Sequence, residues 1–334
     1  MTYKNLIYCL FIVFLIVSCQ SPVDKGDKDN ALDSTETTKK DIPIFNEDSA
    51  YFFVEKQVLF GPRVPNTKAH EECAIYFEQK FHEFADTVIL QRTRVRAYEG
   101  TALNIVNIIA SFKPETNNRI FLCAHWDTRH IAEKDPDAIL QKKPFDGAND
   151  GASGVGVLLE IARILKKHKP NIGIDIILFD GEDYGQPDNS DQAQKPDTWA
   201  LGSQYWSRNT HKPNYYAKYG ILLDMVGDKE ATFLKEGYSM KYAPDVVEKV
   251  WNTAQKLGYS NYFLNKETNA ITDDHYYINT ILGIPTIDII HYDNSTTTGF
   301  FPQWHTHGDN MEQINKETLK AVGQTLVTVI FEEK

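Results

Sequence analysis

Apolar runs that read as buried strands alternate with stretches of helical periodicity from about residue 45 to the C-terminus. In the clearest helical stretch, residues 151–169, Val155, Leu158 and Leu165 follow the three- and four-residue spacing of one helix face. Such alternation is typical of a doubly wound α/β domain, so we predict a mostly parallel central sheet flanked by helices. The expected strands are residues 102–111, 120–124, 174–179, 221–225 and 286–290, and further helices are expected at 245–257 and 316–331.

The residues at the ends of these strands are polar and suited to binding a metal ion. In an open α/β sheet, ligands bind outside the carboxyl ends of the strands, so side chains leaving those ends are expected to meet. A solvated turn would explain one such case but not several independent strands. The residues concerned are His125 and Asp127 after the second strand, Asp180, Glu182 and Asp183 after the third, Asp224 at the fourth and His291 after the fifth, with Asp150 and His305 in nearby loops.

Carboxylates and imidazoles without paired thiolates favour a catalytic zinc ion. Only Cys73 and Cys123 lie beyond the first 19 residues, and no CxxC pair occurs. The candidate ligands suffice for one zinc ion with an open position, or for two zinc ions bridged by a carboxylate. These ligands are His125, Asp150, Asp183, Asp224 and His305.

The acidic segment FDGED, residues 179–183, places two neighbouring acids after one strand. Adjacent residues leaving a strand point to different sides, so Glu182 and Asp183 need not share a function. One can bind the metal while the other faces the substrate as general base and acid, with its pKa raised by the acids around it. By contrast, His70, His82, His168 and His211 have no acidic cluster near them in the sequence and are expected at the surface.

Six segments, in this order, resemble the motifs of one enzyme family: HWD, GANDGASG, FDGED, LLDMVG, DDH and WHT. They are similar to those of the zinc-dependent M28 peptidases, a family that includes aminopeptidases and the animal-type glutaminyl cyclases. FGPRVPNT from Phe60, ALGSQYW after the acidic segment, and Trp304 directly before His305 resemble the cyclase branch, in a form like that of Bacteroidetes bacteria. The resemblance covers nearly the whole body of the chain and implies a zinc aminopeptidase-like single domain.

The resemblance also implies a role for each matching residue. Two departures affect the substrate pocket and the metal. Asp183 stands where the animal members have Glu, and the loop at residues 185–196 lacks the family's Trp, whose place Trp199 or Tyr184 could take. The implied zinc ligands are Asp150, Asp183 and His305, the general base and acid is Glu182, its hydrogen-bonded acidic partners are Asp224 and Asp274, and a wall of the substrate pocket is Trp304.

The implied activity is that of a zinc-dependent glutaminyl-peptide cyclotransferase with one Zn²⁺ per chain. Such an enzyme converts the N-terminal Gln of peptides or proteins to pyroglutamate and releases ammonia. A di-zinc aminopeptidase of the same family is an alternative, because His125 and Asp224 are the ligands that a second zinc ion would need. A non-enzymatic domain is a third reading, which would require the loss of metal ligands that are all present.

The N-terminal segment predicts a lipoprotein. Residues 1–18 contain an apolar run that ends in Ile-Val-Ser before Cys19, which indicates a signal peptide and a lipidated cysteine. Residues 19–44 are polar and read as a tether, so the domain is expected at 45–334. We therefore expect a monomer that is anchored to a membrane of the cell envelope and faces the periplasm. The formal net charge of -11 argues against a nucleic-acid partner.

Overall fold

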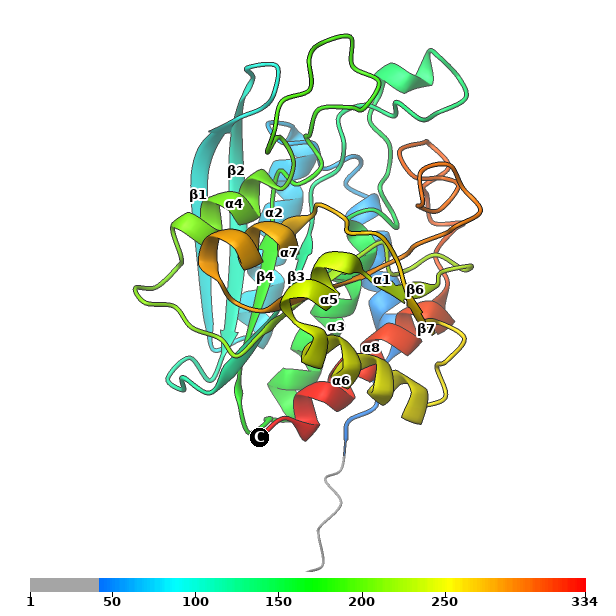
Figure 1. The fold of residues 1–334 in the computed structure, drawn as a ribbon. Helices are drawn as coiled ribbons and strands as arrows, with labels where there is room; N and C mark the ends of the chain where they lie inside the picture. The colour runs from blue at the N-terminus through cyan, green and yellow to red at the C-terminus, as the bar shows by residue number, and fades with distance from the viewer. Residues whose placement is uncertain (1–41) are drawn as a thin grey trace, which may run out of the picture. The chain divides into compact units, whose positions relative to one another are not determined.

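A six-stranded sheet with the order β1–β2–β4–β3–β5–β8 forms the centre of the protein (Figure 1). The structure, a computed structural model, describes residues 42–334. The strands of this sheet are β1 (Thr87–Arg96), β2 (Ala102–Phe112), β3 (Arg119–His125), β4 (Gly173–Phe179), β5 (Gly220–Asp224) and β8 (Thr286–Ile290).

Four neighbouring strands of this sheet are parallel. β4 pairs with β3, β3 with β5 and β5 with β8, and the register aligns Cys123 with Ile177 and Leu222. The hairpin β1–β2 adds two strands in antiparallel pairings. The parallel strands are apolar along almost their whole length, as expected for strands that are covered on both faces. The predicted mostly parallel sheet is therefore confirmed, and the four parallel strands end at the same edge.

Helices cover both faces of the sheet, because successive residues of each strand point to opposite sides. Leu122 belongs to the core under one helical layer, and Cys123 to the core under the other. The first layer contains α1 (Glu47–Val58), α2 (Lys68–Phe84), α3 (Ala152–Lys167), α6 (Pro244–Lys256) and α8 (Lys316–Glu332). The second contains α4 (Leu201–Arg208), α7 (Asp274–Tyr277) and the π-helical turn η2 (Ile278–Leu282).

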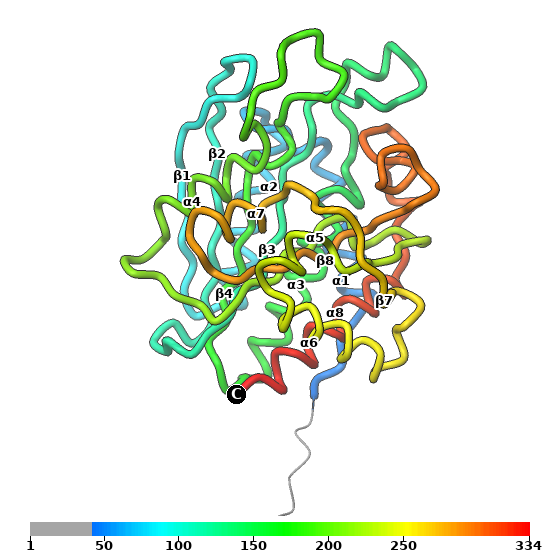
Figure 2. The backbone as a smooth tube through the Cα atoms, viewed as in Figure 1, coloured from blue at the N-terminus to red at the C-terminus, as the bar shows by residue number. Residues whose placement is uncertain are grey.

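Three further elements complete the fold. The helix α5 (Gly237–Tyr242) packs near β8, and β6 (Phe233–Lys235) and β7 (Phe263–Glu267) pair as a small parallel ladder. A single 3₁₀ turn, η1 (Leu140–Lys142), lies in the loop after β3. The loops that follow β3 and β4 extend beyond the carboxyl ends of the strands, at the top of Figure 2.

The two crossovers that leave β3 and β4 diverge to opposite faces of the sheet. The connection from β3 to β4 carries α3 on one face, and the connection from β4 to β5 carries α4 on the other. The chain thus passes from one side of β3 to the other. Open α/β sheets form their ligand crevices at such a point, outside the carboxyl ends of the strands. The polar residues singled out by the sequence lie there.

Several strands and helices were not predicted from the sequence. The strand β1 alternates exposed and half-buried residues at the sheet edge, so it lacks an apolar run. The helices α1 and α2, which precede it, were also not predicted, although Cys73, Phe77 and Phe81 of α2 follow a helical spacing. The predictions for the signal peptide, Cys19 and the tether up to residue 41 lie outside the described residues. Between residues 42 and 334, none of the helices combines the length and the apolar character that crossing a bilayer requires.

A buried ion pair inside the sheet ties β3 to β4. Asp175 accepts hydrogen bonds from Arg119 Nε at 2.7 Å and Nη2 at 2.9 Å, from Ser111 Oγ at 2.6 Å and from Tyr215 OH at 2.7 Å. Both charged side chains are almost fully inaccessible to water. A buried charge is tolerated when its partners satisfy it in this way, and removal of one partner leaves the other charge unpaired.

Replacement of Asp175 by Ala is therefore expected to lower the free energy of unfolding by about 3–5 kcal/mol, because Arg119 would remain buried without a counter-charge. Chemical denaturation followed by circular dichroism measures this loss. Tyr215→Phe removes one hydrogen bond to the same carboxylate and should cost less, about 1.5–3 kcal/mol. Losses below about 1 kcal/mol for Asp175→Ala would contradict a stabilising role of the ion pair.

Candidate active site

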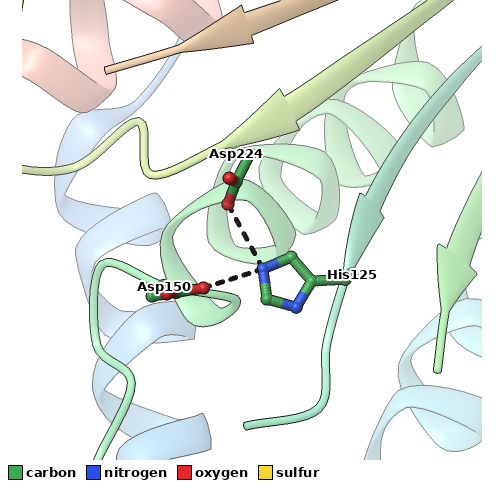
Figure 3. A group of neighbouring side chains, drawn as sticks. All are labelled: His125, Asp150 and Asp224. Carbon is green, nitrogen blue, oxygen red and sulfur yellow. Dashed lines mark hydrogen bonds and ion pairs between the residues drawn. The ribbon is translucent and has the colours of Figure 1, made fainter. Parts of the chain in front are cut away.

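Two groups of potential metal ligands lie side by side at the carboxyl edge of the sheet and share Asp150. The His305 group consists of Asp150, Asp183 and His305, and the His125 group consists of His125, Asp150 and Asp224 (Figure 3). Within each group the ligand atoms lie within 4.8 Å of one another. Asp150 turns Oδ1 toward His125 Nε2, at 3.0 Å, and Oδ2 toward His305 Nε2, at 3.7 Å. The sequence-predicted ligands therefore meet.

The His305 group has the properties of a zinc site. His305 Nε2 lies 3.3 Å from Asp183 Oδ1, and the second oxygen, Asp183 Oδ2, is buried without a hydrogen-bond partner. A buried carboxylate oxygen without a donor is costly, and a bound cation would satisfy it. One imidazole and two carboxylates are suitable ligands for zinc and leave a coordination position open. The residues present thus fit the metal.

The ligand His305 is held in orientation by a second layer of charged groups. Its Nδ1 lies 2.9 Å from Glu133 Oε1, which leaves Nε2 directed at the carboxylates. Arg129 Nε donates to Glu133 Oε2 at 2.7 Å, and Arg129 Nη1 donates to the carbonyl of Asp183 at 2.9 Å. Burial would raise the pKa of Glu133, but His305 and Arg129 hold it well below its ordinary value. Such carboxylate–histidine pairs fix the tautomer of a metal ligand.

The ring of His125 lacks this support. Its Nε2 lies 3.0 Å from Asp150 and 3.2 Å from Asp224, as Figure 3 shows, but its Nδ1 has no hydrogen-bond partner. The nearest oxygen of Asp127 is 3.7 Å away. The Asp127 carboxylate instead accepts the backbone N–H groups of Glu182, at 3.0 Å, and Asp183, at 3.2 Å. The two histidines therefore differ in how firmly their rings are oriented.

The three acids of FDGED have three different environments. Asp180 pairs with His70, whose Nε2 lies 2.8 Å from Asp180 Oδ2, and it also accepts the N–H of Val106 at 2.6 Å. The prediction that His70 is a surface residue is therefore wrong. Its partner lies 110 residues away in the sequence, so no local pattern indicates the pair. Asp183 belongs to the His305 group, and Glu182 belongs to neither metal group.

Glu182 faces the same cavity as the metal ligands, with 12% of its side chain accessible. One of its carboxylate oxygens lies 4.0 Å from His125 Nδ1. Burial raises the pKa of Glu182 well above its ordinary value; His125 opposes the rise, and the negative charges of Asp273, Asp183 and Asp274 add to it. A carboxylate with a raised pKa can both accept and return a proton near neutral pH.

The acid that reaches the cavity from the DDH motif is Asp273 rather than Asp274. Asp273 lines the cavity and also caps the N-terminus of α7, where it accepts the N–H of Asp274. Asp274 is fully buried and does not line the cavity. No hydrogen bond joins it to Glu182 in the described part of the chain, nor is there one between Asp224 and Glu182. The sequence DD contains no signal that separates the two aspartates.

Asp273 is backed by a buried group that the sequence did not single out. Ligand-type atoms of Asp273, His275 and Asp288 lie within 4.8 Å of one another, and His275 Nε2 pairs with Glu236 at 2.9 Å. Burial and the neighbouring acids, Asp273 first among them, raise the pKa of Asp288 well above its ordinary value. Carboxylates this close repel one another when ionised, which favours the protonated form of at least one of them.

Aromatic rings form the walls of the cavity, which has a volume of about 240 Å³. The Trp304 ring stacks on His305 with 3.7 Å between centroids. Trp199 also faces His305, and the guanidinium of Arg129 lies 4.5 Å above its ring. Tyr184 stacks on His130 instead, so Trp199 is the residue that occupies the pocket. A larger cavity of about 690 Å³ lies between α2 and the hairpin β1–β2, away from both metal groups.

The backbone around the site is constrained at four points. His305 and Met225 adopt positive φ angles of 56° and 50°, a strained conformation for side chains of this kind. Gly185 allows the Trp199 ring to approach, because a Cβ there would lie 2.0 Å from the ring. Asp309 accepts the N–H groups of Asn149, at 2.7 Å, and Asp150, at 3.0 Å, and so fixes the loop that carries Asp150.

Comparisons with known proteins agree with this geometry. The model of "Peptidase family M28" matches residues 107–330. A solved structure of Tannerella forsythia glutaminyl cyclase is 53% identical, covers 87% of this chain and is itself covered completely, with a TM-score of 0.86. A structure of a leucine aminopeptidase precursor from Bacteroides thetaiotaomicron is 52% identical, with 88% and 99% coverage and a TM-score of 0.85.

A curated relative, aminopeptidase YwaD of Bacillus subtilis, is 28% identical over 233 residues. The match takes in 68% of this chain but spans only 44% of the length of that relative. The family model thus covers more than half of the chain, and the site contains the ligand types that a zinc peptidase fold requires. The chain belongs to peptidase family M28.

Proposed function

We propose that this protein is a glutaminyl-peptide cyclotransferase, which closes the N-terminal Gln of peptides or proteins to pyroglutamate and releases ammonia. The observation that carries the proposal is the 53% identity to Tannerella forsythia glutaminyl cyclase, with matched coverage of 87% of this chain and 100% of that one. The geometry of the cavity agrees with it, because an acid that is not a metal ligand, Glu182, faces a small pocket with aromatic walls.

We also propose that the chain binds one zinc ion, in the His305 group. Three features support this: the orphaned Asp183 Oδ2, the Glu133 carboxylate behind His305, and the absence of a comparable hydrogen bond behind His125. A histidine with an oriented ring is the better metal ligand. Bound there, zinc would polarise the γ-amide carbonyl of the substrate and make its carbon more electrophilic.

The residues of the chain can move the proton that the reaction requires. The α-amine of a peptide has a pKa of about 7.7–8, so much of it is neutral near neutral pH. The neutral α-nitrogen forms a bond to the side-chain amide carbon and closes a five-membered lactam, and Glu182 accepts one proton from that nitrogen as the bond forms. Glu182 returns the proton to the side-chain nitrogen, whose bond to carbon breaks, and ammonia leaves. The peptide loses one ammonia and gains no water.

The walls of the cavity hold the substrate in the folded shape that this reaction needs. The α-nitrogen must approach the γ-amide carbon to about 3–3.5 Å, which bends the Gln side chain back on itself. Trp304 and Trp199 enclose that conformation from two sides of His305. Asp273 and Asp224 line the same cavity and supply acceptors for the amine hydrogens. The peptide bond after Gln stays outside and is not cleaved.

A di-zinc aminopeptidase is the second candidate, because the His125 group offers a further set of ligands that shares Asp150. In that reading Glu182 would deprotonate a water molecule that attacks the first peptide carbonyl. The 52% identity to a leucine aminopeptidase precursor also supports this candidate. The two activities place different carbonyl groups on the metal, so the products distinguish them.

The division of labour between the adjacent acids predicts opposite effects of two substitutions. Glu182→Gln should retain one zinc ion per chain and lose turnover by roughly 10²–10⁴-fold, since only proton transfer is removed. Asp183→Ala should lose zinc itself, because a ligand disappears. Elemental analysis and an ammonia-release assay on both variants provide the measurement. Two tightly held zinc ions in the wild type would favour the aminopeptidase, and a metal-free Glu182→Gln variant would reverse the assignment.

The reaction products decide the function. We expect Gln-Phe and Gln-β-naphthylamide to yield ammonia and a pyroglutamyl product that is lighter by about 17 Da, the mass of one ammonia, because only the γ-amide reaches the metal. Leu-anilide should not react, since it has no side-chain amide. Mass spectrometry of early time points gives the result. Rapid release of naphthylamine or of Leu, without a cyclised product, would refute the cyclase and leave the aminopeptidase.

We further propose that the protein is a lipoprotein of the cell envelope that faces the periplasm, on the basis of the apolar run and the Ile-Val-Ser-Cys sequence at residues 16–19. Its membrane association should then depend on the Cys19 thiol, because acylation needs it. Wild-type protein is expected in the membrane fraction and a Cys19→Ser variant in the soluble fraction, with immunoblotting as the readout. Identical fractionation of the two would remove this proposal.

A further inference from the structure

The cavity is strongly acidic, and one of its acids has no role in metal binding or in proton transfer. Six of the side chains that line it are carboxylates and none is Lys or Arg: Asp150, Glu182, Asp183, Asp188, Asp224 and Asp273. Five of these belong to the metal groups, to the general base or to its surroundings. Asp188 is exposed to solvent, in the loop after β4, and no ion pair engages its carboxylate among residues 42–334. Its charge is therefore free to act on a bound peptide.

The loop that carries Asp188 is held by hydrogen bonds of its own. The buried side chain of Gln186 donates to Ser190 Oγ at 3.3 Å and to the carbonyl of Ala193 at 3.2 Å, and it accepts the N–H of Lys195 at 2.9 Å. The N–H of Gln186 also donates to Thr198 Oγ1 at 3.1 Å. This pattern closes the loop, at the top of Figure 1, on itself. Because Asp188 is exposed and also lines the cavity, it lies at the cavity rim.

The size of the cavity determines which part of a substrate meets this rim. At about 240 Å³ it is smaller than the roughly 300–1,000 Å³ of sites that enclose a drug-sized ligand, so it holds one residue of a peptide. With the N-terminal Gln inside, the second residue emerges at the mouth. The cavity lining also includes the half-buried apolar side chains of Ile271 and Phe300. Lys and Arg suit such a surface, because each has an apolar stem and a cationic head.

We propose that Asp188 is a specificity-determining residue that favours peptides with Lys or Arg after the N-terminal Gln over peptides with Asp or Glu there. The inference rests on the proposed cyclotransferase function and names the substrate class of that site. Lys134 Nζ lies 5.8 Å from the centroid of the Trp304 ring, but Lys134 does not line the cavity. The charge presented to the second residue is thus negative.

The test compares three amidated dipeptides, Gln-Arg, Gln-Ala and Gln-Glu, on the full-length, zinc-loaded protein. An exposed charge pair is a weak interaction, so we expect kcat/KM for Gln-Arg to exceed that for Gln-Glu by about threefold to tenfold at low ionic strength. The difference should lie in KM, because the contact is the same in the ground state and the transition state. It should shrink as salt rises from roughly 0.02 M to roughly 0.5 M.

Two variants separate the local charge from other effects. Asp188→Asn should abolish most of the difference in kcat/KM between Gln-Arg and Gln-Glu. Asp191→Asn, which removes an equally exposed acid of the same loop that does not line the cavity, should keep the preference. Equal kcat/KM for Gln-Arg and Gln-Glu in the wild type, or an equal slowing of all three peptides by Asp188→Asn, would overturn the inference. Release of no ammonia from any peptide would instead refute the proposed function.

Discussion

Repulsion between carboxylates is the constraint on which the rest of this site depends. The parallel pairing of β3, β4, β5 and β8 brings their carboxyl ends to one edge, and with them more acids than a buried space can hold in ionised form. Histidines, Arg129 and backbone N–H groups offset part of this negative charge by pairing with the acids or donating hydrogen bonds near them. What these donors do not satisfy, above all Asp183 Oδ2, defines the position that a cation would take.

The two histidines differ in the groups that orient their rings, and this difference bears on whether the site binds one metal ion or two. Both rings face Asp150, so proximity alone does not distinguish a one-metal centre from a two-metal centre. The groups behind the rings distinguish them: Glu133, itself held by Arg129, lies 2.9 Å from His305 Nδ1, whereas His125 Nδ1 has no hydrogen-bond partner among residues 42–334 and lies 3.7 Å from Asp127. Loss of such an outer contact typically lowers metal affinity or activity by about 10–100-fold. The same fold can therefore host two chemistries with nearly identical ligand lists.

The sequence predicted the parts of the molecule that local pattern determines. Continuous apolar strands, a strongly periodic helix and the polar residues at strand ends were enough for five of the six sheet strands, the parallel core and the meeting of five candidate ligands, His125, Asp150, Asp183, Asp224 and His305. Long-range pairs were not predictable: His70 with Asp180, and His305 with Glu133, connect residues 110 and 172 positions apart. The choice between Asp273 and Asp274 was also beyond the sequence, because it depends on which of them caps α7.

Asp127 illustrates how one side chain can limit the evolution of a site. Its carboxylate is occupied by the N–H groups of Glu182 and Asp183, which hold the acid pair in position, and it lies too far from His125 to orient that ring. Binding these N–H groups and orienting the His125 ring would require the same two carboxylate oxygens. A shift of Asp127 toward His125 would orient that ring more firmly and would loosen the turn that carries Glu182. Whether such a site favours two-metal hydrolysis or one-metal cyclisation would thus depend on which groups this single carboxylate binds.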